Sequence, residues 1–300
     1  MKSPQQAAKA VLGVIGGSGL YDMPGLRSRR ELRLKTPFGA PSGPIVLGEL
    51  SGVHCAFLPP HGRGHALLPG EVNSRANLWA LKSLGVERVV SVSAVGSLKE
   101  RIAPRDFLFP DQLVDETKGR PASFFGSGLV AHVAFDQPFC PEQSALLAQA
   151  CRRLGIRSHE GGTLVCMEGP AFSTKAESNL HRRLGYDIIG MTALPEAKLA
   201  REAELCYAAV CLVTDYDCWK DGEEVSSGKV VENLAANVSN AQRLLAAAAP
   251  RLAARARRCR CADALRGAIF TDPKHADRRT VRRLDLLVSR YLRPTGGRKP

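Results

Sequence analysis

The sequence predicts an α/β domain with a largely buried central sheet, followed by a basic C-terminal extension. Short apolar runs rich in Val, Ile and Cys alternate with segments of helical periodicity, which is typical of α/β folds. Hydrophobic residues make up 44% and charged residues 24% of the 300-residue chain, as expected for one large globular domain. We therefore predict a domain over residues 1–250 and an extension over 251–300.

The expected elements follow one another along the chain. Apolar runs predict strands at 11–16, 53–59, 89–93, 164–168, 188–192 and 207–214. Helical periodicity predicts helices at 73–84, 141–154, 174–184, 195–204 and 229–247. Pro250 marks the expected end of the domain. In the extension, 262–270 and 281–292 each carry an apolar stripe and predict two short docked helices.

The basic charge is concentrated in the extension. The formal net charge is +13, and residues 251–300 hold 15 Lys and Arg against 4 Asp, which leaves 27 basic and 25 acidic residues before them. The nearly neutral body argues against a nucleic-acid-binding domain, and the extension lacks the aromatic residues of a single-strand binder. We expect it to cover a surface of the protein, and nucleic acid is an unlikely partner.

Nine cysteines, an odd number without a recognisable leader pattern, do not predict a secreted disulfide framework. Cys259 and Cys261 flank one residue and are candidates for redox activity or for pairing with other cysteines. No further ligands follow at finger-like spacing, so we expect no metal. Apolar runs stay short of the ~18 residues that a membrane helix needs, and we expect a cytoplasmic protein without a membrane partner.

Polar side chains follow two strands within 187–219. Met191 and Thr192 come after the first strand, and Asp215 and Asp217 come after the second. Ligands of α/β sheets bind beyond the carboxyl ends of the strands, so these side chains are expected in one crevice. By itself, a pair of acids at this spacing is equally consistent with a solvated turn.

Seven segments carry recognisable motifs in a fixed order. They are GGSGL at 16–20, PHGR at 60–63, the stretch 72–82, SAVGS at 93–97, EGPAFS at 168–173, GMT at 190–192 and TDYDCW at 214–219. Together they resemble the trimeric purine nucleoside phosphorylase family, in particular its branch that acts on 5'-methylthioadenosine. The resemblance implies the nucleoside phosphorylase fold, a central mixed sheet flanked by helices, and a homotrimer with sites at subunit interfaces.

The glycine-rich turn is the first part of the phosphate site that the resemblance implies. Gly16 directly follows a strand, where glycines let backbone N–H groups converge on an anion, and Ser18 adds a hydroxyl. The other phosphate-binding positions are His61, Ser93, Ala94 and Thr192. Without the resemblance, a glycine turn after a strand would be only a turn, and His61 would be a surface or packed histidine.

Pro60 departs from the family pattern, which usually has arginine directly before the histidine. A guanidinium would supply a strong bidentate contact to phosphate. We expect the proline to weaken phosphate binding, or to shift the contact to Arg63.

The resemblance also implies the nucleoside contacts. It places Phe172 against the purine face, Ser173 close to the purine and Met191 beneath the ribose, where an aromatic ring and a thioether suit apolar surfaces. Taken without the resemblance, Phe172 and Met191 are core residues. His132 and its neighbours resemble a segment that reaches the adjacent subunit's site, and Val230 is expected in the apolar wall around a 5'-methylthio group.

Asp215 and Asp217 are the predicted catalytic pair. A protonated carboxyl at N7 neutralises the purine as the glycosidic bond breaks, and an apolar pocket raises the carboxyl pKa enough for this role. The resemblance implies that Asp215 donates this proton, and that Asp217 either accepts from the 6-amino group or shares the proton with Asp215. Family members that act on 6-oxopurines have an asparagine as a key base contact, so the acid pair favours adenine.

The sequence therefore predicts phosphorolysis of 5'-methylthioadenosine to adenine and 5-methylthioribose 1-phosphate. Inorganic phosphate is the expected co-substrate, and no metal or organic cofactor is expected. Two alternatives remain at this point. One is a phosphorylase of 6-oxopurine nucleosides or methylthioinosine, and the other is an inactive nucleotide- or RNA-binding relative that lost its chemistry with Pro60.

Overall fold

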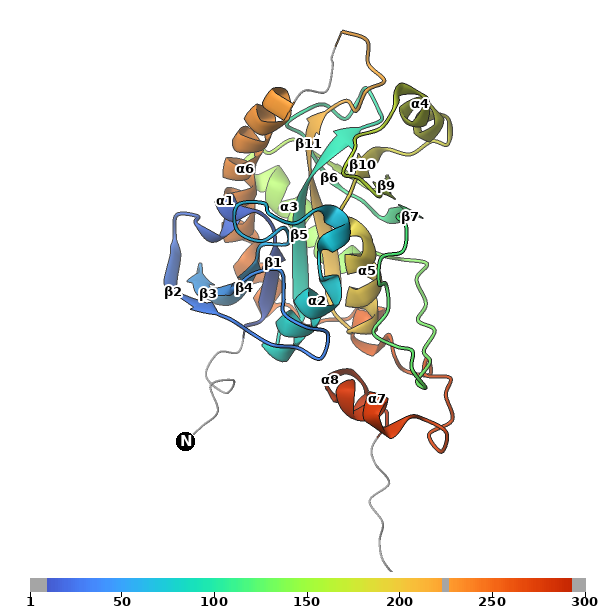
Figure 1. Cartoon of the computed structure of the whole chain (residues 1–300). Helices are drawn as coiled ribbons and strands as arrows, with labels where there is room; N and C mark the ends of the chain where they lie inside the picture. The colour runs from blue at the N-terminus through green and yellow to red at the C-terminus, as the bar shows by residue number, and fades with distance from the viewer. Residues whose placement is uncertain (1–9, 223–226, 293–300) are drawn as a thin grey trace, which may run out of the picture.

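The predicted α/β architecture with a mixed central sheet is confirmed by the computed structural model (Figure 1). The structure describes residues 10–222 and 227–292, without the side chains of Ser18 and of residues 227–230. In this part of the chain, the strands are β1 (Leu12–Ile15), β2 (Leu26–Leu32), β3 (Ile45–Leu50), β4 (Val53–Leu58), β5 (Arg88–Ser97), β6 (Phe107–Phe109), β7 (Gln112–Glu116), β8 (Ser158–Glu160), β9 (Thr163–Met167), β10 (Ile188–Gly190) and β11 (Cys206–Asp215).

One sheet contains all of these strands. Its main path runs β2-β3-β4-β1-β5-β10-β9-β7, and β11, β6 and β8 branch from β5. β1 pairs in parallel with β4 and β5, and β11 runs parallel to β5 along the other side. β10 pairs antiparallel with the end of β5. The carboxyl ends of β1, β4, β5 and β11 therefore meet at one edge of the sheet.

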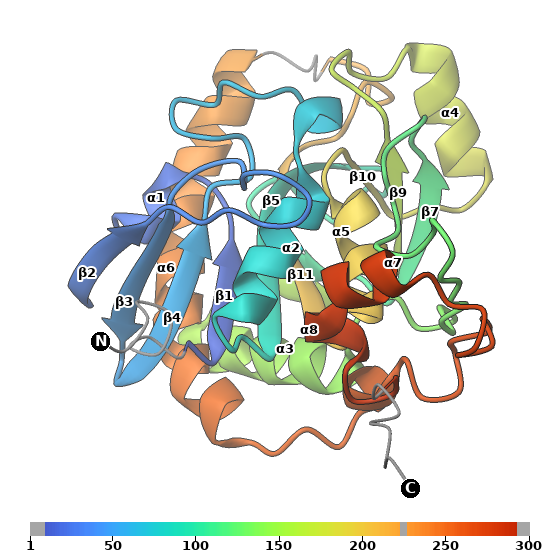
Figure 2. The same ribbon diagram turned by 60° about the horizontal axis from the view of Figure 1, so that its bottom comes forward.

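Helices cover both faces of the sheet (Figures 1 and 2). The described helices are α1 (Ser18–Tyr21), α2 (Ser74–Ser83), α3 (Pro141–Leu154), α4 (Lys175–Arg183), α5 (Ala193–Glu202), α6 (Ser227–Ala254), α7 (Arg278–Arg283) and α8 (Asp285–Val288), with 3₁₀ turns η2 (Pro69–Glu71) and η3 (Arg260–Asp263). α3 and α6 pack together on one face, and α2 and α5 pack on the other. None of the described helices has the length and apolarity to cross a membrane.

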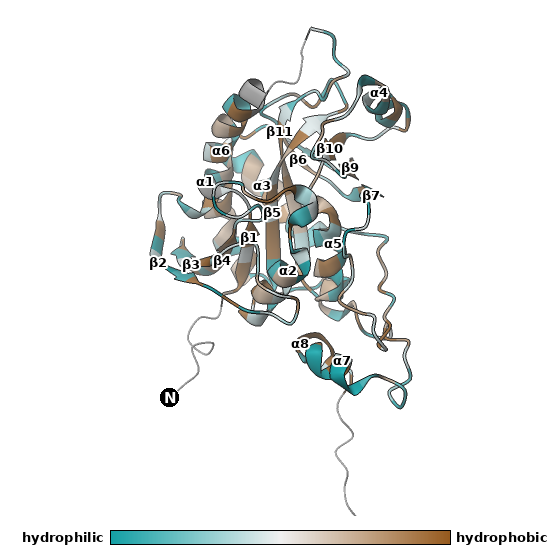
Figure 3. Cartoon of the chain, in the orientation of Figure 1, coloured by the Kyte–Doolittle hydropathy of each residue, from teal (hydrophilic) through white to brown (hydrophobic). Residues whose placement is uncertain are grey.

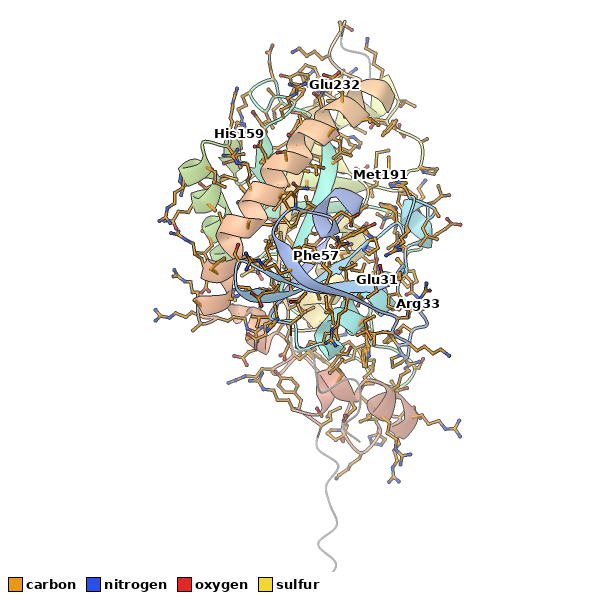
Figure 4. All side chains as sticks on the ribbon, turned by 90° about the vertical axis from the view of Figure 1, so that its left-hand side faces the viewer. Glu31, Arg33, Phe57, His159, Met191 and Glu232 are labelled. Atoms are coloured by element: carbon orange, nitrogen blue, oxygen red, sulfur yellow. The ribbon has the colours of Figure 1, made fainter. Side chains whose placement is uncertain are left out.

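Two apolar clusters form the core, one on each face of the sheet. The cluster under α3 and α6 includes Phe57, Phe107 and Leu244, and the other includes Trp79, Tyr207 and Leu199. Figure 3 shows the hydrophobic colour concentrated in the central strands, whereas α7 is hydrophilic. In Figure 4, Phe57 lies in the strand layer, and Glu232 lies towards the upper end of α6. Burial on both faces explains why the central strands appear in the sequence as continuous apolar runs.

Six strands and five helices were predicted near their observed positions, but several elements were missed. β2 is mostly exposed and carries four charged residues, so it has no apolar run. The short strands β6 and β8 form a branch from β11. Each has three residues, which is too short to show a periodicity in the sequence. β3 and β7 were also missed. Exposed or very short strands depend on their neighbours in the sheet, which a local pattern does not contain.

The last helix was predicted over 229–247, and this predicted end is too early. α6 runs through Pro250 to Ala254. Ala249 and Leu252 lie on either side of the proline and are fully buried, so the apolar face of the helix continues past it. Tertiary packing here outweighs the cost of a proline inside a helix. Beyond it, one 3₁₀ turn and two short helices replace the expected helix pair.

Candidate active site

A cavity of about 680 Å³ lies beyond the carboxyl ends of β1, β4, β5 and β11. Its position is set by register, because Ile15, the last residue of β1, pairs with both Leu58 of β4 and Ser91 of β5. Eight of the predicted site residues line the cavity: His61, Ser93, Ala94, Phe172, Met191, Thr192, Asp215 and Asp217. Side chains far apart in the sequence thus lie in one cavity, as predicted from the polar residues that follow the strands.

Asp215 ends β11 and is held by two hydrogen bonds. The Thr214 hydroxyl donates to Oδ2 at 2.7 Å, and the backbone N–H of Asp217 donates to Oδ1 at 2.8 Å. Burial raises the pKa of Asp215, the negative charge of Asp217 raises it further, and the two hydrogen bonds act in the opposite direction. The carboxyl therefore retains a proton to higher pH than an exposed aspartate does.

Asp217 lies in the same turn with a left-handed backbone, at φ 50°. It is 5% exposed, and its Oδ2 has no hydrogen-bond partner among the residues that the structure describes. A buried carboxylate oxygen without a partner is costly unless a ligand supplies a donor. Because Asp217 lines the cavity, its free acceptor is available to a bound molecule.

The end of β11 is fixed by helix α6. Asn233 and Asn237 donate their side-chain amides to the carbonyls of Thr214 and Val213, at 2.7 and 2.9 Å. On the other side, Gly96 of β5 packs against the acid pair, and a Cβ at this position would meet Asp215 Oδ1 at 3.0 Å. The pair is therefore held rigidly, and β5 approaches it more closely than a residue with a side chain would permit.

His61 also lines the cavity, from the loop after β4. Its Nδ1 lies 2.9 Å from the carbonyl of Leu67, which assigns the proton of the neutral ring to Nδ1. Burial lowers the pKa of His61, the contact with Leu67 raises it, and His65, stacked on the ring at 4.3 Å, lowers it. A neutral His61 presents Nε2 as an acceptor for a protonated phosphate oxygen.

Pro60 is buried and lines the cavity, but Arg63 does not take the place of the missing arginine. Arg63 has a 56% exposed side chain and forms an ion pair with Glu31 of β2, which Figure 4 labels on the outer strand. It is absent from the residues that line the cavity. The predicted shift of the phosphate contact to Arg63 is therefore not what this structure shows.

The predicted purine and ribose contacts lie at the cavity, with one exception. Phe172 is 57% exposed at its edge, and Met191 packs on Gly169, where a Cβ would meet Met191 Sδ at 2.6 Å. Ser173 lies behind this wall, with its hydroxyl 3.9 Å from the sulfur of Met167, and does not line the cavity. An exposed aromatic ring at a cavity edge is suited to stacking on a flat ligand.

Besides Ser173, four predicted residues lie outside this lining or outside the described side chains. Gly16 donates its N–H to the Leu58 carbonyl at 3.1 Å, and in this turn Gly17 and Gly19 line the cavity instead. His132 is exposed and packs on Phe270, with ring centroids 5.0 Å apart. The side chains of Ser18 and Val230 belong to the part that the structure does not describe.

Two buried side chains were missed: Glu196 lines the cavity, and Arg120 hydrogen-bonds to Met191 of the lining. Glu196 accepts from Ser91 and Tyr207, each at 2.9 Å, and burial raises its pKa to about 7. The side chain of Arg120 is 3% exposed, and it donates to the carbonyls of Met191 and Leu194 at 2.7 and 2.8 Å. Arg120 thereby holds the turn that contains Thr192.

Comparison with known proteins gives consistent results. A family model described as the phosphorylase superfamily matches residues 11–250. The chain is 53% identical to S-methyl-5'-thioadenosine phosphorylase of Gloeobacter violaceus, over 94% of this chain and 96% of the relative. It is 52% identical to the protein of the same name from Geobacter sulfurreducens, over 94% and 99%.

Solved structures agree with these relatives. A methylthioadenosine phosphorylase from an antarctic soil metagenomic library superposes with a TM-score of 0.89 at 48% identity, covering 93% of this chain and 99% of that one. A mutant of the Schistosoma mansoni adenosine/methylthioadenosine phosphorylase, solved with methylthioadenosine, has a TM-score of 0.78 at 38% identity and covers 83% and 93%. The resemblance found in the sequence is confirmed, and the chain belongs to the phosphorylase superfamily.

Proposed function

We propose that the protein catalyses phosphorolysis of 5'-methylthioadenosine to adenine and 5-methylthioribose 1-phosphate. The observation that carries the proposal is one cavity lined both by an acid pair, half-buried Asp215 and buried Asp217, and by the polar groups of His61, Ser93 and Thr192. The relatives at 52–53% identity bear the name of this activity. The reaction belongs to purine and methionine salvage.

The proposed chemistry divides the cavity into two ends. At one end, phosphate binds near His61, Ser93, Ala94 and Thr192. Gly16 and Ser18 are assigned to the same anion site from the family resemblance. A phosphate oxygen forms a bond to C1' while the bond from C1' to N9 of the purine breaks. At the other end, Asp215 passes its proton to N7, so adenine leaves neutral.

The nucleoside is proposed to lie between these ends. Phe172 stacks on the purine, Ser173 supports that wall, and Met191 contacts the ribose. Asp217 accepts from the 6-amino group through its free oxygen. The reaction needs an anion site, a sugar site and a proton donor, and the residues named here supply each without a catalytic metal or organic cofactor.

We further propose that the working enzyme is a cytoplasmic homotrimer. His132 and Val130 are exposed on a segment outside the chain's own cavity, which is the placement expected of residues that complete a neighbour's site. Val230 is assigned to the apolar wall around the 5' substituent. None of the nine cysteines forms a disulfide bond in the structure, as suits a reducing compartment. The residues after 250 are proposed as an extension to the catalytic body.

The direct experiment is to incubate the purified protein with 5'-methylthioadenosine, inosine or methylthioinosine, with and without phosphate, and to measure the released base by chromatography. Adenine released only with phosphate is the expected result. Hypoxanthine release would assign the protein to 6-oxopurine nucleosides. Binding of substrates without any release would instead identify an inactive relative.

Restoring the family's arginine by Pro60→Arg is expected to lower KM for phosphate by roughly tenfold, because a charge-assisted hydrogen bond contributes about 1.5–3 kcal/mol. Pro60 already lines the cavity, so the guanidinium enters it directly. Steady-state kinetics at varied phosphate measures the effect. Pro60→Met is the control for loss of the proline, and an equal change in both variants would show that the charge is not the cause.

Asp217→Asn is expected to weaken selection for adenine nucleosides by about 10–100-fold, since its amide can donate to a 6-oxo group whereas the carboxylate only accepts. The ratio of kcat/KM for 5'-methylthioadenosine to that for methylthioinosine measures the change. Asp221→Asn is the matched control, because the Asp221 side chain is 89% exposed. If this ratio of kcat/KM values is unchanged in Asp217→Asn, Asp217 does not recognise the base.

A further inference from the structure

Four cysteines converge at the end of the sheet opposite the cavity. The sulfur atoms of Cys140, Cys206, Cys259 and Cys261 all lie within 4.8 Å of one another. Cys140 precedes α3, and Cys206 begins β11. The other two bracket the start of η3 in the extension. The spacing of the cysteines in the sequence did not predict this group, because two of its members come from distant elements of the body.

The group matches the ligand set of a structural zinc site. Zinc in such sites has four ligands at tetrahedral angles with Zn–S bonds of about 2.3 Å, which places the sulfurs about 3.8 Å apart. The sulfurs of Cys206 and Cys259 are 3.4 Å apart, and none of the six pairs exceeds 4.8 Å. Three of the four residues are buried and Cys259 is half-buried, as in a closed site without a solvent position.

The surroundings favour negative charge on the sulfurs. The guanidinium of Arg88 is buried, with 2% of the residue exposed, and its Nη1 lies 3.8 Å from Cys206 Sγ. Its Nη2 donates to the Arg255 carbonyl at 2.7 Å, and no carboxylate forms an ion pair with Arg88 in the described residues. A buried cation of this kind needs a compensating anion, and a zinc ion with four thiolates carries two net negative charges.

The N-terminus of α3 also favours negative charge on the cysteine sulfurs. Cys140 is the N-cap of this 14-residue helix, where the exposed N–H groups and the helix dipole stabilise an anion. No side chain caps the helix. Two independent features, a buried guanidinium and a helix N-terminus, thus face one cluster of thiols.

We propose that these four cysteines bind one structural Zn²⁺ per chain. Binding replaces the four S–H bonds with four Zn–S bonds and releases the thiol protons to solvent, without any oxidation. The ion joins the extension to the catalytic body. Beyond η3, the extension continues as a bridge between Ile269 and Ala131, and the Ala268 carbonyl accepts from the N–H of His132 at 2.8 Å. The zinc therefore also anchors the segment that presents His132.

The test is metal analysis of the full-length protein, purified under reducing conditions without chelators. We expect about one zinc per chain in the wild type and less than about a tenth of this in Cys259→Ser and in Cys261→Ser. Cys151→Ala is the matched control, because Cys151 is buried on α3 but its sulfur is outside the cluster. The control is expected to keep its zinc, and the loss of zinc is expected to lower the unfolding temperature.

A second measurement covers the case in which the serine variants fold poorly. Wild-type protein, stripped with a chelator under reducing conditions, is titrated with Co²⁺, and the expected spectrum is that of a tetrahedral tetrathiolate site. Failure of the stripped and the untreated wild type to hold zinc or cobalt would overturn the proposal. An intact mass lower by four hydrogen atoms, with disulfide-linked peptides from these cysteines, would also overturn it, and iron in place of zinc would overturn the choice of ion.

Discussion

Replacing Asp215 with Asn is expected to reduce kcat for 5'-methylthioadenosine by about 10²–10⁴-fold, the usual contribution of a positioned general acid. The amide keeps the shape of the side chain, and it can still accept the hydrogen bond from the N–H of Asp217. It cannot pass a proton to N7, so adenine must leave as an anion. KM is expected to change much less than kcat, because the proton matters mainly in the transition state.

The pH profile separates this role from a structural one. Burial raises the pKa of Asp215, so the free enzyme holds the required proton below that pKa and loses it above. The wild-type kcat/KM is therefore expected to fall as pH rises through the raised pKa, whereas the residual activity of Asp215→Asn lacks this step. A variant that keeps more than about a tenth of kcat, or the same alkaline limb, would show that another group protonates the purine.

The central fold and the acid pair could be predicted because their signals are local. Each strand buried on both faces is a continuous apolar run, and each strand end leaves polar residues at the same edge of the sheet. Asp215 and Asp217 directly follow such a run. The identity of their ligand was accessible only through the family resemblance, since two acids after a strand are also consistent with a turn.

The convergence of the four cysteines and the position of Arg63 outside the cavity depend on contacts that no local pattern contains. Cys140 and Cys206 are not near the pair in the extension along the chain, so their spacing resembles no metal motif. Arg63 lies two residues after His61, but its ion pair with Glu31 of the edge strand draws it to the surface. β2 itself was missed because it is exposed, and the partner of Arg63 was therefore missed with it.

Arg120→Met is expected to destabilise the protein by about 2–3 kcal/mol, because it leaves three backbone carbonyls without their charged donor, whereas water can still solvate the carboxylate of Glu168, whose side chain is 30% exposed. Arg120 follows β7, and its Nε donates to the carboxylate of Glu168 at 3.1 Å. Its Nη2 donates to the backbone carbonyl of Glu168 at 2.5 Å, and its Nη1 reaches the carbonyls of Met191 and Leu194. Methionine keeps the apolar stem but leaves these acceptors without a donor.

Arg29→Met is the control for that substitution. Arg29 pairs with Asp22 on the surface, where its side chain is 42% exposed, so its loss is expected to cost less than about 1 kcal/mol. Urea unfolding measures both variants. A similar small cost for Arg120→Met would mean that water satisfies the freed carbonyls and that the guanidinium does not hold the ends of β7, β9 and β10 together.

Arg120→Met is also expected to affect catalysis, because Arg120 fixes the position of the turn that contains Thr192. Arg120 holds the backbone on either side of Thr192, but its donors are used on protein acceptors, so it does not contact phosphate itself. A loosened turn moves the Thr192 hydroxyl relative to His61, and KM for phosphate should rise more than KM for the nucleoside. Equal increases for both substrates would indicate general unfolding of the cavity. A selective increase for phosphate would identify Arg120 as the residue that positions the anion site.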